Sequence, residues 1–83
     1  MPFELYEQVA LARDIPEEGL RKGDVATVVD RHPSPKPGGE GGYSLEMFNA
    51  IGHTIVVTVV PESAIEPLRE DQVFSVRLLA KSA

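Results

Sequence analysis

The chain has 83 residues, of which 42% are hydrophobic and 25% charged, and its formal net charge is −5. This length and composition are typical of one globular domain with a single modest core, and not of a disordered chain. The chain has no cysteine, which excludes a disulfide scaffold, a cysteine-ligated metal and a thiol nucleophile.

Apolar and polar residues alternate from Leu5 to Leu11, which predicts a half-buried first strand that Phe3 can join. A helix over the same residues would be cut short by Pro16 and Gly19, so we favour the strand. The next residues, 13–23, are predicted to form a long loop. Pro16 sets a turn in it, and glycines 19 and 23 each accept a positive φ without steric cost.

The second strand is predicted from about Asp24 to Arg31, because small apolar residues occupy both of its faces. Three of the seven prolines and four of the seven glycines follow between His32 and Gly42. This composition is typical of a mobile loop, which we expect over residues 33–42.

A hairpin is predicted next, from a third strand over Tyr43–Phe48 and a fourth over His53–Val60. One face of the fourth strand, formed by residues 55, 57 and 59, is wholly apolar. The other face is half apolar, so Val56 and Val60 on it need either cover or a partner.

The residues Pro61–Leu68 are predicted to form a single helical or 3-10 turn, bracketed by two prolines. The residues Gln72–Leu79 then alternate as a final strand. The sequence therefore predicts an all-β fold, a small five-stranded SH3-like barrel with one short helical turn before the last strand. We expect residues 1–83 to form this single domain.

Several short motifs resemble a small bacterial family, the domain of unknown function 4926. These motifs are Asp14-Ile15-Pro16 with Gly19-Leu20, Lys22-Gly23-Asp24, Thr27-Val28-Val29, Tyr43-Ser44-Leu45-Glu46-Met47-Phe48, Gly52-His53-Thr54 and Pro61-Glu62-Ser63. The resemblance covers about residues 3–68 and implies an SH3-like barrel with no assigned activity. The long loop over residues 32–42 and the segment 69–83 depart from the family pattern. That last segment either completes the barrel or packs against another chain.

Catalytic groups in convergent geometry are not evident in the sequence. The two histidines, His32 and His53, lack metal-ligand spacing, and no serine lies in a Gly-x-Ser-x-Gly elbow. The glycine-rich half of the loop lacks the Lys-Ser/Thr of a phosphate loop. We therefore expect no enzymatic activity, no cofactor and no metal site.

The candidate binding residues are Phe48, Val56 and Glu46, because the third and fourth strands carry more apolar side chains than one face needs. These residues predict a non-catalytic module that binds another protein, in an accessory, regulatory or antitoxin-like role. Self-association into a homo-oligomeric structural protein is an alternative.

A second alternative rests on Lys22-Gly23-Asp24 before a valine-rich strand, which also resembles the KOW motif of ribosomal and transcription-linked barrels. Only Arg21-Lys22 supports nucleic-acid binding, and the acidic net charge opposes it.

The first residues, Met1–Leu5, form neither the basic nor the apolar region of a signal peptide. The longest apolar run, Ile55–Val60, is too short to span a bilayer. We therefore expect a cytoplasmic location and no membrane partner.

Overall fold

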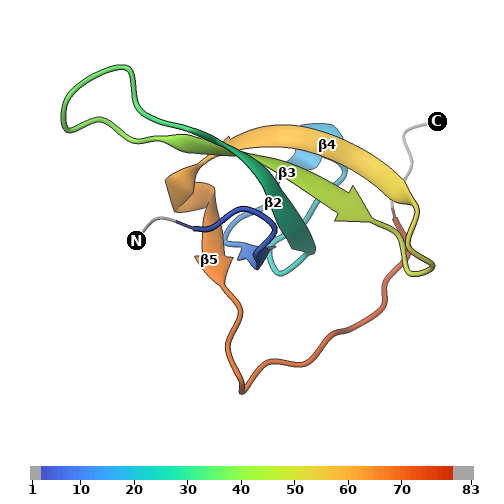
Figure 1. Ribbon diagram of the computed structural model, residues 1–83. Coiled ribbons are helices and arrows are strands. Elements are labelled where there is room, and N and C mark those ends of the chain that lie inside the picture. The colour runs from blue at the N-terminus through green and yellow to red at the C-terminus, as the bar shows by residue number, and fades with distance from the viewer. Residues whose placement is uncertain (1–2, 80–83) are drawn as a thin grey trace.

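The computed structural model describes residues 3–79, which form one five-stranded antiparallel sheet with the strand order β4-β3-β2-β1-β5. The elements are β1 (Gln8–Leu11), η1 (Pro16–Glu18), β2 (Val25–His32), β3 (Gly42–Phe48), β4 (Thr54–Pro61), η2 (Glu62–Ala64) and β5 (Ile65–Pro67), where η marks a 3-10 turn. Strands β2, β3 and β4 make a strongly twisted layer, and β5 and the first residues lie across from it (Figure 1). The sheet thus curls into a small barrel-like body.

The core lies inside this curl and takes alternate residues from the strands, as the pleat requires. Its fully buried side chains are Leu11, Leu20, Leu45, Val9 and Val28. The small residue Ala26 of β2 is also buried. Each buried Val or Leu contributes roughly 1.5–3 kcal/mol from removal of its side chain from water, so most of the stability comes from this cluster.

The first strand is shorter than the alternation predicts, because the backbone turns between Glu4 and Glu7. Tyr6 has a positive φ of 69°, and the N–H of Glu7 donates to the carbonyl of Glu4 at 3.2 Å. Pairing with β2 as part of strand β1 starts at Gln8. Phe3 lies before this turn and is buried against Tyr43, with the two ring centroids 5.5 Å apart. The prediction of a strand from Leu5 is therefore wrong for its first half.

The long loop before β2 contains η1, and its two glycines adopt the predicted left-handed backbone. Gly19 has φ 72° at the end of η1, and Gly23 has φ 93° just before Asp24. A side chain at either position would be strained by the backbone alone. The predicted turn chemistry of this loop is confirmed.

The central strands agree with the sequence to within one residue at each end. The β3–β4 hairpin pairs over its whole length, with a register shift beside Phe48. Pro61 ends β4 opposite Gly42, a position at the edge of the sheet that tolerates the missing N–H of proline.

The more apolar face of β4 is exposed and the less apolar face is buried, which is the reverse of what hydrophobicity suggests. Val60 is buried, and Val56 is half-buried against the core. The wholly apolar set, Ile55, Val57 and Val59, faces away from the core and is exposed. Register with β3 decides this outcome, because Val60 lies opposite the buried Tyr43 and Val59 opposite Ser44.

The last strand of the sheet is Ile65–Pro67 and not Gln72–Leu79. The predicted turn is present as η2, but it ends at Ala64, and Ile65 then pairs with Leu11 of β1. Residues 72–79 belong to no strand. They alternate as a strand would, but the place beside β1 is already filled by a shorter segment nearer in sequence.

Within residues 3–79, no helix is long and apolar enough to cross a membrane.

Candidate protein-binding surface

The outer face of β3 and β4 carries an exposed apolar patch. It consists of Phe48, Ile55, Val57 and Val59, and we call it the outer patch. Val57 and Val59 are 62% and 64% exposed, and Phe48 is 43% exposed. The residues Glu46 and Ser44 of β3 lie opposite the two valines. The patch therefore combines branched aliphatic side chains and one aromatic ring at the end of a twisted sheet.

Polar side chains hold the rim of this patch in place. The hydroxyl of Thr54 donates to Glu46 Oε2 at 2.6 Å. On the neighbouring strand, His32 Nε2 lies 2.7 Å from Ser44 Oγ. An apolar centre with a polar rim is the usual composition of a protein–protein interface.

The three residues predicted from the sequence do not all lie together. Phe48 and Glu46 share the outer face of β3, as the alternation indicates. Val56 lies on the opposite face of β4, half-buried against the core. The structure thus separates Val56 from the other two, because its register partner is the buried Met47.

The valines and Ile55 of the outer patch were not assigned to a site by sequence reasoning. The sequence does contain a signal for them, namely a wholly apolar strand face. At the edge of a sheet, such a face is as suited to a partner as to a core. Strand order, which is not readable from one sequence, decides between the two.

The backbone of β4 is also free along one edge, since β4 is the terminal strand of the sheet. The N–H of Glu62 donates to the carbonyl of Gly41 at 2.9 Å, and hydrogen-bonded pairs alternate in an antiparallel ladder. From this bond the alternation places the N–H and C=O groups of Val57 and Val59 toward the free edge. β4 has no charged residue, so it lacks the lysines that usually protect an exposed edge.

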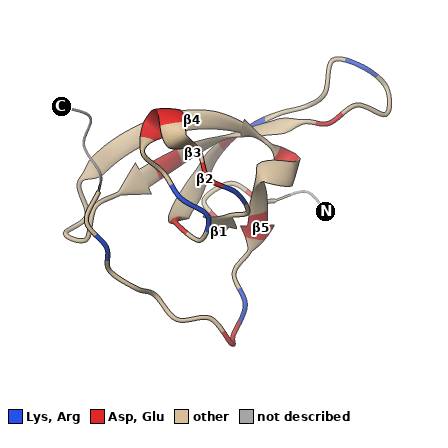
Figure 2. Cartoon of the chain, turned by 180° about the vertical axis from the view of Figure 1, so that it is seen from behind, with Lys and Arg blue, Asp and Glu red and all other residues tan. Residues whose placement is uncertain are grey.

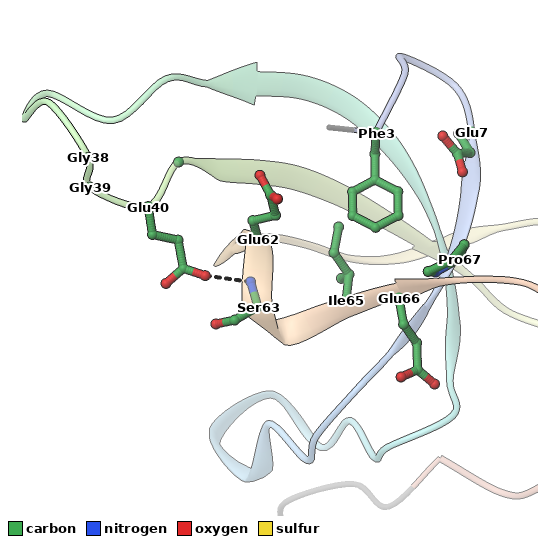
Figure 3. Close-up of a pocket in the computed structure, with 11 residues that line it drawn as sticks. Phe3, Glu7, Gly38, Gly39, Glu40, Glu62, Ser63, Ile65, Glu66 and Pro67 are labelled. Carbon is green, nitrogen blue, oxygen red and sulfur yellow. Dashed lines mark hydrogen bonds between the residues drawn. The ribbon is translucent and has the colours of Figure 1, made fainter. Parts of the chain in front are cut away.

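A concave region lies between β5 and the loop over residues 33–41, which we call the Pro/Gly loop (Figure 3). It is a cleft of about 730 Å³ lined by Phe3, Glu7, Gly38, Gly39, Glu40, Gly41, Glu62, Ser63, Ile65, Glu66 and Pro67. Glu40 is committed to the protein itself, because its Oε1 accepts the N–H of Ser63 at 2.6 Å. The hydrogen bonds from Ser63 lower the pKa of Glu40.

Carboxylates in this cleft do not form a cation site. Among residues 3–79, no group of three or more His, Asp or Glu side chains is arranged to hold a metal ion. The contact between Glu40 and Ser63 instead fastens the Pro/Gly loop to η2, so this region serves the fold.

Among residues 3–79, the basic residues are scattered over the loops and β2 and form no continuous stripe (Figure 2). Arg21 and Lys22 lie in the loop before β2, and their backbone N–H groups donate to Asp24 and Asp14 at 2.8 Å each. Carboxylates therefore lie directly beside the one basic pair that could contact phosphate, which weakens the field of that pair.

The chain after β5 carries a further set of exposed apolar residues. Figure 1 shows it as a trace that swings away from the sheet after β5 and then turns back toward the barrel. Val73, Phe74, Val76 and Leu78 are all between 74% and 92% exposed. Arg77 holds the segment to the barrel, because its guanidinium pairs with the carboxylate of Asp24 and donates to the carbonyl of Gly19 at 3.3 Å.

The sheet defines a class, a small all-β domain of five antiparallel strands with a 3-10 turn before the last strand. The family model of the domain of unknown function DUF4926 matches residues 5–67, and the chain belongs to this family. The match ends with β5, so the extended segment lies outside the family domain. No curated protein and no solved structure matches the chain.

Proposed function

We propose that this protein is a non-catalytic module that binds another protein through the outer patch, in an accessory or regulatory role of the antitoxin type. The observation that carries the proposal is the row of exposed valines on β4, next to Phe48. A strand that turns its wholly apolar face to solvent costs solubility, and in small domains such a face marks a contact surface.

The composition of the patch supports a protein as the partner. Aromatic and branched aliphatic side chains supply the buried centre of such an interface, and the hydrogen-bonded Glu46 and Ser44 supply its rim. A nucleic acid would require a basic surface, which the arrangement of Arg21 and Lys22 beside carboxylates does not supply.

Capture from an extract of the native cells tests the proposal. The tagged full chain, its Phe48→Ala variant and its Leu5→Ala variant are compared after nuclease treatment, with bound proteins identified by mass spectrometry. Leu5 is a matched control, because it is 43% exposed like Phe48 but lies outside β3 and β4. We expect a stoichiometric protein partner with the wild type and the control, and a loss of about tenfold or more with Phe48→Ala.

Equal capture by Phe48→Ala, with the fold intact by circular dichroism, would contradict the assignment of the patch. Recovery only of ribosomal or transcription proteins, and only without nuclease, would support the KOW-like alternative instead.

A further inference from the structure

We propose that the segment Val73–Leu79 of one copy adds as a strand to the free edge of β4 in a second copy, and that the two copies make this contact reciprocally. We call this segment the arm. The proposal does not depend on the outer patch binding another protein. It concerns the backbone edge of β4 and the arm, which both lie within this chain.

The arm has the sequence of a strand but no sheet to join. Its residues alternate between Val73, Ser75, Arg77 and Leu79 on one side and Phe74, Val76 and Leu78 on the other. Within residues 3–79, no backbone hydrogen bond joins residues 73–79 to the barrel. The carbonyl of Leu78 accepts Arg77 Nη1 at 3.1 Å, and the backbone groups from Val73 to Val76 remain available for an intermolecular ladder.

Only the last part of the arm lies against its own barrel. Arg77 and Leu79 are half-buried, and Arg77 is fixed by Asp24 and Gly19. The other side, with Phe74, Val76 and Leu78, stays exposed. The ion pair therefore anchors the arm and leaves an apolar side free for a second molecule.

The edge of β4 is the matching acceptor. Val57 and Val59 point their backbone N–H and C=O groups toward the unpaired edge, where another strand could bind them. Their apolar side chains are exposed. The opposite edge of the sheet is protected, because β5 has only three residues and ends in Pro67. β4 has eight residues, and the loop that contains η1 lies beside only its last four, Thr58–Pro61.

Charge favours a contact between arm and barrel. Residues 1–71 contain all 13 acidic and six of the eight basic residues, a net charge of −7. Residues 72–83 contain only Arg77 and Lys81, a net charge of +2. Arg77 is paired with Asp24 of its own barrel, and no acidic side chain in residues 72–83 opposes contact between the arm and the acidic barrel of another copy.

A second copy, and not the same chain, is the occupant that the anchor favours. Asp24 lies directly before β2, and β3 separates β2 from β4. Arg77 holds the arm to Asp24 and Gly19 of its own chain, and within residues 3–79 no backbone hydrogen bond joins the arm to its own β4. Reciprocal exchange between two copies satisfies both edges with the symmetry that most homodimers have.

Analytical ultracentrifugation of the full chain tests this inference. We expect the wild type to sediment as a dimer, with twice the 9.0 kDa chain mass. Val76→Asp in the arm and Val57→Lys on the edge should each give a folded monomer, because each places a charge in the ladder. Ala50→Asp and Ile51→Lys are matched controls with the same charges at exposed positions of the β3–β4 loop, outside the contact, and both should stay dimeric.

Mixing the two monomeric variants gives a sharper test of exchange. Val57→Lys retains an intact arm and Val76→Asp retains an intact edge, so an equimolar mixture should form a 1:1 heterodimer. A monomeric wild type, a dimer that persists in both variants, or a mixture that stays monomeric would each overturn the proposal. These outcomes are independent of capture of a partner by Phe48.

Discussion

Two buried or half-buried polar contacts fix the ends of the chain to the barrel at the scale of single residues. The hydroxyl of Tyr43 accepts the backbone N–H of Phe3 at 2.9 Å within the core. Asp24 accepts the backbone N–H of Arg21 at 2.8 Å and also binds the guanidinium of Arg77. The contacts of Tyr43 with Phe3 and of Asp24 with Arg77 join residues far apart in sequence, so neither is readable from local pattern.

Removal of the Tyr43 hydroxyl should lower the stability of the barrel. In Tyr43→Phe the ring contact with Phe3 remains, but the buried N–H of Phe3 loses its acceptor. We expect the free energy of unfolding in urea to fall by about 1–3 kcal/mol. Tyr6→Phe is the control, since Tyr6 is 74% exposed, and it should change little. Equal effects of the two changes would contradict the role of the Tyr43–Phe3 contact.

The ion pair between Arg77 and Asp24, which anchors the arm, should break in acid. Burial opposes ionisation of Asp24, but the hydrogen bonds from Arg77 and Arg21, with the charges of both arginines, outweigh it and lower the pKa of Asp24 below 3.8. A lowered pKa in the folded state means that the stabilisation is complete above the ordinary value and is lost as the pH falls through the lowered one.

Nuclear magnetic resonance of the arm residues tests this anchor. Dilute, monomeric protein should show restrained amides in residues 73–79 at neutral pH and mobile ones below the pKa of Asp24. Arg77→Ala should free the arm at every pH. Arg69→Ala is the control, because the guanidinium of Arg69 pairs with the exposed Asp71 two residues along the chain, and the pH profile should not change. An arm equally mobile at all pH values in the wild type would contradict the anchor.

At the scale of elements, the strands from β2 to β4 could be predicted from alternation, because their local pattern and their tertiary environment agree. The first and last strands along the chain could not be predicted in this way. The first strand loses its first half to a turn at Tyr6, and the last strand is a three-residue segment that alternation alone does not reveal. The segment Gln72–Leu79 has the better strand pattern, but the space beside β1 is filled by Ile65–Pro67, which η2 delivers directly.

The candidate site shows the same division between local and tertiary information. Phe48 and Glu46 lie together on the outer face, as the alternation of β3 predicts. The position of Val56 depends on register with Met47 across the hairpin. A bulge beside Phe48 sets that register, and one sequence does not reveal such a bulge.

The orientation of β4 gives a direct prediction about stability. Val60→Ala should lower the free energy of unfolding by roughly 2 kcal/mol, because a buried side chain loses its packing. Val57→Ala should have almost no effect on the stability of the monomer, since Val57 is exposed. The measurement is urea unfolding of both variants at a protein concentration too low for dimerisation. A larger loss for Val57→Ala would show that the faces of β4 are assigned in reverse.

At the scale of the whole molecule, the exposed apolar groups are concentrated on one terminal strand and one arm. A barrel of this size needs its inner face for stability, so the exposed apolar residues of β4 and of the arm are in excess of the core.

The central claim is that the outer patch is the contact surface for another protein. Titration of the methyl-labelled full chain with the captured partner, followed by nuclear magnetic resonance, tests it most directly. We expect the largest changes at the methyl groups of Ile55, Val57 and Val59 and small changes in the buried Val9 and Leu20. Changes confined to the cleft beside Glu40, or to the loop with Arg21 and Lys22, would contradict the claim.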